Sequence, residues 1–308
     1  MTAAAEPARP AAARARPAAA ELAGPVRLGG LELSACSDVT FGLDGGLMFG
    51  TVPRTIWGRA YAADDRNRVA TATRCLVVRA RDAAGHEAVV LVDTGLGDLA
   101  AGDRFRHLYG VTDPAWRLLA ELASAGIEPE DVTHVVLTHL HFDHVGGAAR
   151  ATPAGPRPTF PAARYLVHER ELAYAGAPDR RSRASYLPET WEPLAAAGVL
   201  DTVAGETEVI PGVRLRDAPG HTDYHQVVTV SGGGRTVLFT ADLFPYALHL
   251  KPHYVPAIDL DPRRTMATRS RYLERISAEG WWLLFEHDTR HALVQVEEDL
   301  SVTPATLS

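Results

Sequence analysis

The sequence predicts a mixed α/β protein that folds as one layered domain. Short apolar runs rich in β-branched residues, such as residues 88–92 and 134–137, alternate with stretches that carry helix start signals. Hydrophobic residues make up 46% of the 308 residues and charged residues 22%, which is typical of a globular chain with a sizeable core. No shift in composition separates the two halves. We therefore expect a single domain over residues 25–300 and a short tail over residues 301–308.

The first third of the chain is predicted to be a tail followed by strands. Residues 1–24 are rich in Ala, Pro and Arg and lack both a periodic apolar face and the apolar core of a secretory signal, so we expect a disordered tail. Residues 26–33 resemble a hairpin, and residues 75–79 and 88–92 read as buried strands. Residues 43–57 are expected to be an apolar, glycine-rich loop. It either covers the core or forms a wall facing a substrate, through Met48, Phe49 and Trp57.

The rest of the chain alternates helices and strands. Asp113-Pro114 is expected to open a helix that runs through Leu122, and Asp261-Pro262 one that runs through Met266 to Ile276. Strands are predicted over residues 131–137, 164–168, 208–215, 226–230, 236–240 and 281–285, with a helical turn over residues 169–175. Residues 177–195 are polar and irregular, which indicates a lid or an insertion.

Composition excludes several classes of partner. The net charge is −7, the only lysine is Lys251, and no basic run is interleaved with aromatic residues, so we expect no nucleic acid partner. No apolar run approaches the ~20 residues that span a bilayer, so we expect no membrane partner. Cys36 and Cys75 are far apart in sequence and read as buried small hydrophobes, which favours a reducing, cytoplasmic location.

A dense group of metal-binding residue types follows the apolar run that ends at residue 137. Four candidate ligands lie within six positions, just before a glycine pair at 146–147: His139, His141, Asp143 and His144. Imidazole nitrogens and carboxylate oxygens suit zinc, iron or manganese better than calcium or magnesium. A strand that runs into such a loop holds its ligands in fixed directions, so this loop predicts a metal site.

Three later residues occur in the same setting, at a strand end or in the adjoining turn: His221, Asp242 and His287. Taken singly, either histidine could be structural and the aspartate could cap a turn. Together with the first group they make seven candidate ligands, which are too many for one tetrahedral zinc but suit two metals if one carboxylate bridges. Asp242 is the expected bridge, because an imidazole nitrogen does not readily bind two cations. Asp93, at a strand end, is expected to orient a histidine from behind, and His225 is expected to form structural hydrogen bonds.

Two adjacent cations predict hydrolysis. They would lower the pKa of a shared water, polarise a carbonyl or phosphoryl oxygen and stabilise a leaving alkoxide. The sequence has no Gly-x-Ser-x-Gly elbow that would supply a competing nucleophile. We expect two divalent cations, zinc first, with iron, manganese or cobalt as alternatives.

Residues 138–147, Thr-His-Leu-His-Phe-Asp-His-Val-Gly-Gly, are similar to the signature of the metallo-β-lactamase superfamily, and Asp93-Thr-Gly, Pro-Gly-His221 and Ala-Asp242 resemble its accompanying motifs. The resemblance covers residues 26–300 and implies a four-layer αββα sandwich with the metals at one edge. It also implies that Asp242 bridges the two metals and that Asp93 lies behind the ligands. The remaining ligands divide into two implied sets: His139, His141 and His221 for one metal, and Asp143, His144 and His287 for the other.

Other stretches look like the quorum-quenching lactonase branch of that superfamily: residues 43–53, 109–112, 242–249 and 287–288. Members of this branch open N-acyl homoserine lactones and related γ-butyrolactones. Having Asp242 rather than a cysteine at the bridge argues against an antibiotic-degrading zinc β-lactamase. A tyrosine shortly after the bridging aspartate contacts substrate in some lactonases, and Tyr246 lies one step out of that register, with His249 as a second candidate. The candidate catalytic residues are therefore Asp143, Asp242, Tyr246 and His249.

Three hypotheses of function follow. In the first, a metal-bound hydroxide attacks the carbonyl of a small-molecule lactone. In the second, the same site cleaves a thioester, an aryl ester or a phosphotriester, because a shared fold does not select the bond. In the third, the centre is a di-iron redox site or a silent binding module. The first is preferred, and a homodimer is left open.

Overall fold

The computed structural model describes residues 21–22, 24–111 and 116–305, which contain two sheets of seven strands each. The first sheet pairs strands that are consecutive in the chain except where β6 and β7 are skipped. Its β4, β5, β8 and β9 run parallel to one another, while the remaining pairs are antiparallel. The order in this sheet is β1 (Val26–Leu28), β2 (Leu31–Asp44), β3 (Arg68–Arg81), β4 (Glu87–Val92), β5 (His134–Val136), β8 (Arg164–His168) and β9 (Leu200–Val203).

The second sheet contains the strands of the C-terminal third of the chain, in chain order. Its pairs are antiparallel except for β13 and β14, which are parallel and joined through a helix. The strands are β10 (Thr207–Ile210), β11 (Val213–Asp217), β12 (Gln226–Gly232), β13 (Arg235–Phe239), β14 (Trp282–Leu284), β15 (Leu293–Val296) and β16 (Val302–Pro304). A small two-stranded sheet joins β6 (Ala149–Arg150) to β7 (Arg157–Pro158).

The two large sheets pack face to face because their central strands are apolar on both faces. Successive side chains of a strand point to opposite faces. Leu76 and Val78 accordingly lie in the cluster between the sheets, whereas Val77 lies in the cluster on the outer face. From the second sheet, Val228 and Val230 of β12 point into the same central cluster. This sandwich of two apolar inner faces is the core of the molecule.

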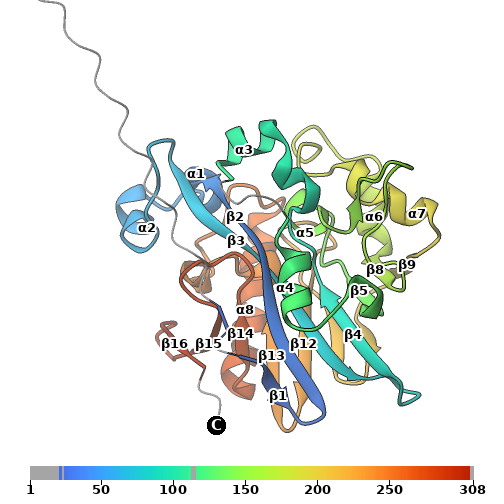
Figure 1. Cartoon of the computed structure of the whole chain (residues 1–308). Coiled ribbons are helices and arrows are strands. Elements are labelled where there is room, and N and C mark those ends of the chain that lie inside the picture. Colours follow the sequence, from blue (N-terminus) through green and yellow to red (C-terminus); the bar gives the residue numbers. More distant parts are fainter. Residues whose placement is uncertain (1–20, 23, 112–115, 306–308) are drawn as a thin grey trace, which may run out of the picture.

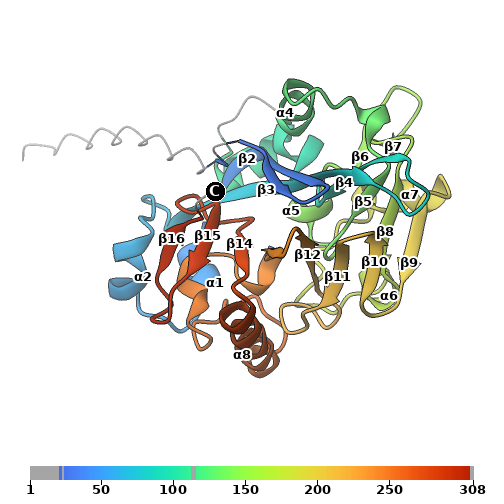
Figure 2. The ribbon, with the colours of Figure 1, turned by 90° about the horizontal axis from the view of Figure 1, so that it is seen from below.

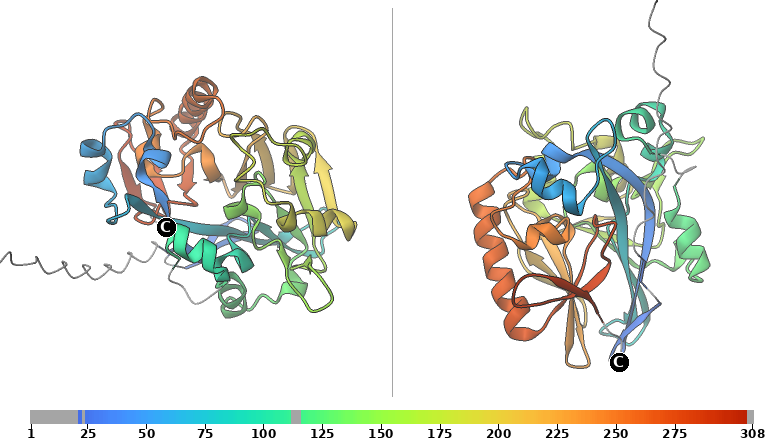
Figure 3. Two further views of the ribbon diagram at one scale, coloured as in Figure 1. Left: turned by 90° about the horizontal axis from the view of Figure 1, so that it is seen from above. Right: turned by 90° about the vertical axis from the view of Figure 1, so that its left-hand side faces the viewer.

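Helices cover the two outer faces and complete four layers. On the first sheet, α4 (Leu118–Ser124), α6 (Glu169–Ala175) and α7 (Glu192–Ala196) contribute apolar residues to the outer cluster. On the second sheet, α8 (Pro262–Glu279) buries Tyr272 and Ile276. Figure 2 shows α4 above the first sheet and α8 below the second, and the right-hand view of Figure 3 shows the sheets between the orange α8 and the green helices. The αββα architecture predicted from the sequence is confirmed.

The sequence signals for α8 act as expected. The Asp261 side chain accepts hydrogen bonds from the backbone N–H groups of Arg263 and Arg264, and Pro262 occupies the first turn. Gly280, with a φ of 64°, ends the helix in a left-handed conformation. The predicted start at Asp261-Pro262 is confirmed, and the helix continues beyond the predicted Ile276 to Glu279.

Residues 43–57 were expected to form a loop, but the structure places two short helices there, α1 (Gly45–Phe49) and α2 (Arg54–Ala60). The Asp44 carboxylate caps α1 by accepting from the N–H groups of Gly46 and Leu47. The glycines in residues 43–57 favour a loop prediction, so the capping signal at Asp44 was missed. The remaining helices are short: α3 (Asp103–Tyr109), seen at the top of Figure 1, and α5 (Phe142–Val145).

Several other predictions can be compared with the structure. The hairpin at residues 26–33 is confirmed as β1 and β2. The helix start at Asp113-Pro114 lies outside the described residues. Residues 302–304, expected in a tail, form β16 against β15, and the insertion at 177–195 ends in α7. Cys36 and Cys75 are buried free thiols as predicted, and they lie directly opposite each other on β2 and β3. None of the helices that the structure describes is long and apolar enough to cross a membrane.

Candidate metal centre

The predicted ligands gather where two parallel strand pairs end. β4 and β5 are parallel neighbours, so Asp93 and the loop after β5 leave the first sheet at the same edge. The Asp93 carboxylate accepts hydrogen bonds from the Thr138 backbone N–H at 2.9 Å and the Thr138 hydroxyl at 2.7 Å, which fixes the start of the ligand loop. β13 and β14 are likewise parallel, and they are followed by Asp242 and His287.

The single turn of α5 aims the ligands of the first group. His141 is its N-cap residue, and Asp143 and His144 lie in the turn itself, so side chains at successive positions point to different sides of one small centre. His139 and His144 are fully buried, and their rings lie 4.0 Å apart. Four residues that are adjacent in sequence can therefore contribute to two metal positions.

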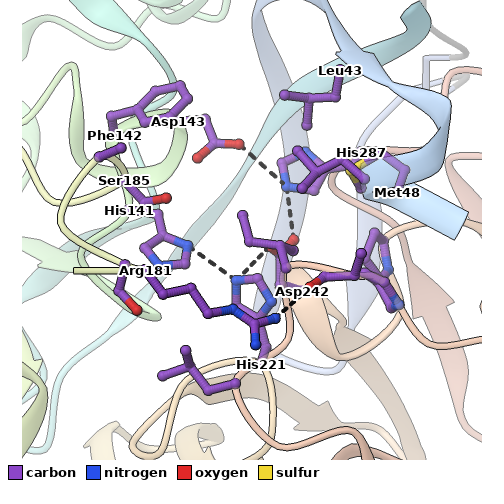
Figure 4. Close-up of a pocket in the computed structure, with 18 of the residues that line it drawn as sticks. Leu43, Met48, His141, Phe142, Asp143, Arg181, Ser185, His221, Asp242 and His287 are labelled. Atoms are coloured by element: carbon purple, nitrogen blue, oxygen red, sulfur yellow. Dashed lines mark hydrogen bonds and ion pairs between the residues drawn. The ribbon is translucent and has the colours of Figure 1, made fainter. Parts of the chain in front are cut away.

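The later ligands reach the same place from the second sheet. His221 Nε2 lies 3.0 Å from His141 Nδ1, and His287 Nε2 lies 3.2 Å from His144 Nε2. The two oxygens of Asp242 face different partners: Oδ2 lies 2.9 Å from His221 Nε2, and Oδ1 lies 2.8 Å from His287 Nε2. Figure 4 shows Asp242 between His221 and His287. This is the position expected of a carboxylate that bridges two cations.

The donor atoms of the seven predicted ligands form two groups, each compact enough for one cation, and a third cluster combines His144 with Asp93 and Glu286. Within each group the candidate ligand atoms lie within 4.8 Å of one another. One group contains His139, His141, His221 and Asp242, and the other contains Asp143, His144 and His287. Both sets match those that the sequence resemblance implies.

The hydrogen bonds of the imidazoles show that these groups fit metal ions. His144 Nδ1 donates to Asp93 at 3.0 Å and His287 Nδ1 donates to the Ala72 carbonyl at 2.7 Å. In the neutral rings, both Nε2 atoms then carry lone pairs that face each other. His139 Nε2 is buried and has no hydrogen-bond partner among the described residues. Lone pairs at such separations repel unless a proton or a metal cation lies between them, so the neutral rings fit a pair of divalent metals.

The pKa values of the histidines follow from the same geometry. Burial, together with the neighbouring imidazoles, holds the pKa values of His139 and His141 well below their usual range, so both rings are neutral and ready to bind metal. Burial alone would also lower the pKa of His221 and His287. The carboxylate of Asp242, assisted by Asp259 and Glu286 respectively, outweighs burial and raises the pKa of His221 to about 10 and that of His287 to about 9. Without metal, protons thus occupy part of the centre.

Comparison with known proteins identifies the fold family. The family model for the metallo-beta-lactamase superfamily matches residues 69–287, which is more than half of the chain and includes all seven candidate ligands. This chain belongs to the metallo-beta-lactamase superfamily. The family assignment and the donor geometry together support a metal-dependent hydrolase.

Two relatives show how similar this chain is to other proteins in sequence. A probable metallo-hydrolase of Mycobacterium tuberculosis is 36% identical over 181 residues, which cover 51% of this chain and 54% of that protein. The chain thus spans about half the length of this curated relative. An N-acyl homoserine lactonase of Bacillus thuringiensis is 28% identical over 218 residues, covering 66% of this chain and 77% of the relative.

Solved structures share the fold over nearly the whole chain. A probable metal-dependent hydrolase from Staphylococcus aureus superposes with a TM-score of 0.83 at 25% identity and covers 92% of this chain and 98% of its own. The dizinc quorum-quenching lactonase AidC superposes with a TM-score of 0.73 at 22% identity and covers 94% and 100%. At that identity, the second likeness is evidence for the fold only.

Two carboxylates behind the ligands were not predicted from the sequence. Asp259 Oδ1 accepts from His221 Nδ1 at 2.9 Å while its Oδ2 accepts from the Thr265 hydroxyl at 2.8 Å. Glu286 is fully buried and lies 3.2 Å from His144 Nδ1. Asp259 carries no motif that could have revealed it. The position of Glu286 next to His287 at a strand end was a usable signal.

Asp93, His225 and the strained backbone complete the support of the centre. Asp93 lies behind His144, in the orienting position expected from the sequence. His225 donates from Nδ1 to the Ala218 carbonyl and accepts the Asp242 N–H at Nε2, so its predicted structural role is confirmed. Asp93 and Ala241 both adopt left-handed φ values, 56° and 41°. Such conformations persist in non-glycine residues where surrounding structure imposes them.

Tyr246 and His249 do not reach the cavity that the other candidates share. The Tyr246 hydroxyl is fully buried, lies 2.6 Å from the Thr71 hydroxyl and donates to the Ala70 carbonyl. His249 accepts the Tyr246 N–H at Nδ1 and donates from Nε2 to the Met48 carbonyl. Both side chains are buried behind the cavity wall and hydrogen-bonded there. The structure therefore does not place them in the substrate contact that the sequence predicts.

A cavity of about 290 Å³ opens directly onto the candidate ligands. Its polar floor includes His141, Asp143, His221, Asp242 and His287. The walls come from α1, α5, the segment at 181–185 and the loop at 256–260. Of the three aromatic or sulfur side chains predicted to form a wall, Met48 lines the cavity, whereas Phe49 and Trp57 stack behind it with ring centroids 5.0 Å apart. Residues 43–57 therefore do both things that the sequence allowed: they line the cavity through Met48 and cover the core through Phe49 and Trp57.

Proposed function

We propose that this protein hydrolyses the ring ester of a small lactone, of the N-acyl homoserine lactone or γ-butyrolactone type. The observation that carries the proposal is a two-metal donor set at the floor of a small cavity with apolar walls. Such a cavity suits a substrate with one reactive carbonyl and a short apolar substituent. Relatives named as N-acyl homoserine lactonases, at 28% identity, support the same choice.

The seven ligand residues would hold two divalent cations, which we propose to be zinc because the donors are imidazoles and carboxylates. When bound, such a pair makes a water acidic near neutral pH and polarises the ester carbonyl. Asp242 would keep the two positions at a fixed separation, because its two oxygens already face opposite groups.

The remaining chemistry belongs to Asp143. Its carboxylate lines the cavity, and its Oδ2 lies 3.9 Å from His287 Nε2. We assign it two tasks: it accepts the proton that the attacking water loses and returns that proton to the ring oxygen as the C–O bond breaks. One water and one lactone then give one hydroxy acid. Leu43, Met48 and Phe142 exclude bulk water from the ring.

The test is a substrate panel on zinc-loaded, full-length protein, followed by measurement of acid release. γ-Butyrolactone and homoserine lactones with short acyl chains are expected to be hydrolysed with a kcat/KM at least tenfold above that for p-nitrophenyl esters, thioesters and paraoxon. Asp143→Asn is expected to lower lactone kcat by about 100-fold or more, since a positioned proton acceptor contributes on that scale. Intact lactones alongside rapid cleavage of another ester class would refute the lactonase assignment.

A further inference from the structure

One cationic side chain overlooks the cavity and has no role in the chemistry proposed above. Among the described residues that line the cavity, Arg181 is the only lysine or arginine. It lies in the segment at 177–195, outside the two sheets, and its guanidinium remains positively charged at any physiological pH. The other charged groups facing the cavity are the ligand residues themselves. Arg181 therefore has no counter-charge in the wall other than the metal-binding carboxylates.

The backbone on both sides holds Arg181 in place. The Asp179 carboxylate accepts the backbone N–H groups of Arg181 and Ser182, which fixes the turn that carries the side chain. The Nη2 atom of Arg181 donates to the carbonyls of Ala257 and Asp259, on the loop that also orients His221. The bonds found among the described residues use Nη2, which leaves the other N–H groups of this solvent-exposed guanidinium for a ligand.

Arg181 is a single cationic side chain in a cavity whose other walls are largely apolar. Figure 4 shows Leu43 and Met48 beyond His287, and Arg181 on the opposite side, next to His221. The ligand groups lie between them. A molecule whose ester carbonyl is held at the centre thus presents one flank to Leu43 and Met48 and another to the Arg181 guanidinium, which lies beside the apolar loop at 256–260.

We propose that Arg181 is a specificity-determining residue that binds a carboxylate on the substrate, so that the preferred substrate is an anionic lactone or ester with an apolar group on its other flank. The inference rests on the proposed hydrolytic function and names the substrate class of that same site. A carboxylate suits the site because guanidinium–carboxylate hydrogen bonds are charge-assisted and directional. A neutral amide in the same position would retain the shape but lose the charge.

Binding measurements test the inference without requiring turnover. The ligands are the ring-opened acids of two γ-butyrolactones, one with a carboxymethyl group beside the carbonyl and one with a carbamoylmethyl group there. Calorimetry on zinc-loaded protein should show the carboxymethyl acid binding about 10- to 100-fold more tightly, the range expected for a hydrogen bond to a charged group. Arg181→Ala should abolish that difference, and Arg181→Lys should retain part of it. Arg183→Ala is the matched control, because Arg183 is exposed on the same segment and does not line the cavity.

Hydrolysis of the two parent lactones is the second measurement. The wild type should favour the carboxymethyl lactone in kcat/KM by a similar factor, mainly through KM, and Arg181→Ala should bring the ratio of the two kcat/KM values close to one, whereas Arg183→Ala should leave that ratio unchanged. Equal binding of both acids by the wild type would overturn the inference, as would an equal loss for both acids in Arg181→Ala. If the binding preference holds but neither lactone is cleaved, the anion subsite stands and the lactonase proposal fails.

Discussion

Three of the ligand imidazoles are held in place by a hydrogen bond from Nδ1, the nitrogen that faces away from the metal centre. His144 donates to Asp93, His221 to Asp259 and His287 to the Ala72 carbonyl. These acceptors set both the tautomer and the ring orientation, so the nitrogens that face the centre carry lone pairs. The strength of metal binding therefore depends on residues that never touch the metal.

Asp259→Asn should weaken binding of a divalent metal by about 10- to 100-fold, since loss of an orienting carboxylate has effects of that size. The reason is that the amide accepts a weaker hydrogen bond from His221 Nδ1. Chelator competition with zinc measures the affinity. Asp261→Ala is the control: it removes the cap of α8 and should lower unfolding free energy by about 1 kcal/mol with metal affinity unchanged. Equal affinities in wild type and Asp259→Asn would contradict the assigned role.

Metal binding should also be strongly linked to pH. Nearby carboxylates, Glu286 first, outweigh burial and raise the folded, metal-free pKa of His144 well above its usual range, and the pKa values of His221 and His287 are raised to about 10 and about 9. All three rings must therefore lose a proton to bind metal. Metal affinity should fall as pH falls from about 9 toward 7. Zinc titration at pH 7.5 in buffers of different ionisation enthalpy should reveal release of about three protons per protein. A pH-independent affinity with no proton release would show that the imidazoles are already neutral.

At the level of elements, the ligand loop is held by close contact between two turns. Gly147 lies so near the chain after β4 that a Cβ there would meet the Thr94 carbonyl oxygen at 2.3 Å. Gly146 is similarly close to the Leu96 carbonyl. The glycine pair that follows the ligand motif is thus required by packing of one backbone on another, which is what positions α5 against the end of β4.

Gly147→Ala should lower the unfolding free energy by about 1–3 kcal/mol, the usual cost of forcing an extra group into a packed site. Urea unfolding of the metal-free protein measures this directly and separates it from any loss of metal. Gly30→Ala provides the comparison, because a Cβ there meets nothing within 4 Å and the change should stay within about 0.5 kcal/mol. If the two variants unfold alike, the close contact does not constrain the loop.

A second structural tie links the insertion at 177–195 to the metal centre. The buried Glu171 carboxylate of α6 accepts hydrogen bonds from the hydroxyls of Tyr186 and Thr222 and from the Leu140 N–H. Tyr186 also packs edge-on against His141, with ring centroids 4.8 Å apart. The insertion is therefore part of the wall that supports the ligands, and it carries Arg181 to the cavity.

For the whole molecule, the centre joins the two sheets. Asp143 and His144 follow β5 of the first sheet, whereas Asp242 and His287 follow β13 and β14 of the second. Because the cations bind the folded chain and not the separated parts, metal should stabilise the fold by mass action. Removing it leaves the central apolar cluster intact, so the metal-free protein should remain folded.

Chelation should lower the melting temperature by about 5–10 °C compared with protein in zinc at about 100 times its Kd. Calorimetric scans at several zinc concentrations measure the shift, which should grow logarithmically with free zinc. Calcium is the control ion, because this imidazole-rich donor set does not suit it. A melting temperature that does not change with zinc concentration would show that the cation does not join the sheets.

Much of the predicted fold and metal site rests on short sequence patterns. The ligand motif, the capping residues of α8 and the alternating apolar strands act over a few residues, so their consequences can be read from the sequence. The seven candidate ligands were recognised in advance because each follows a strand or sits in a turn beside one. The structure then brought all seven together.

Tertiary structure alone decided the rest. Asp259 is placed behind His221 by chain packing across many residues, and no short pattern records this, whereas the position of Glu286 beside His287 at a strand end was a usable signal. Tyr246 and His249 were assigned to substrate from a resemblance to lactonases, but packing places both side chains behind the cavity wall. Arg181 faces the cavity because an insertion folds back over the site. Patterns of neighbouring residues determine strands, caps and ligand types, whereas the direction in which a remote side chain points depends on how the elements pack.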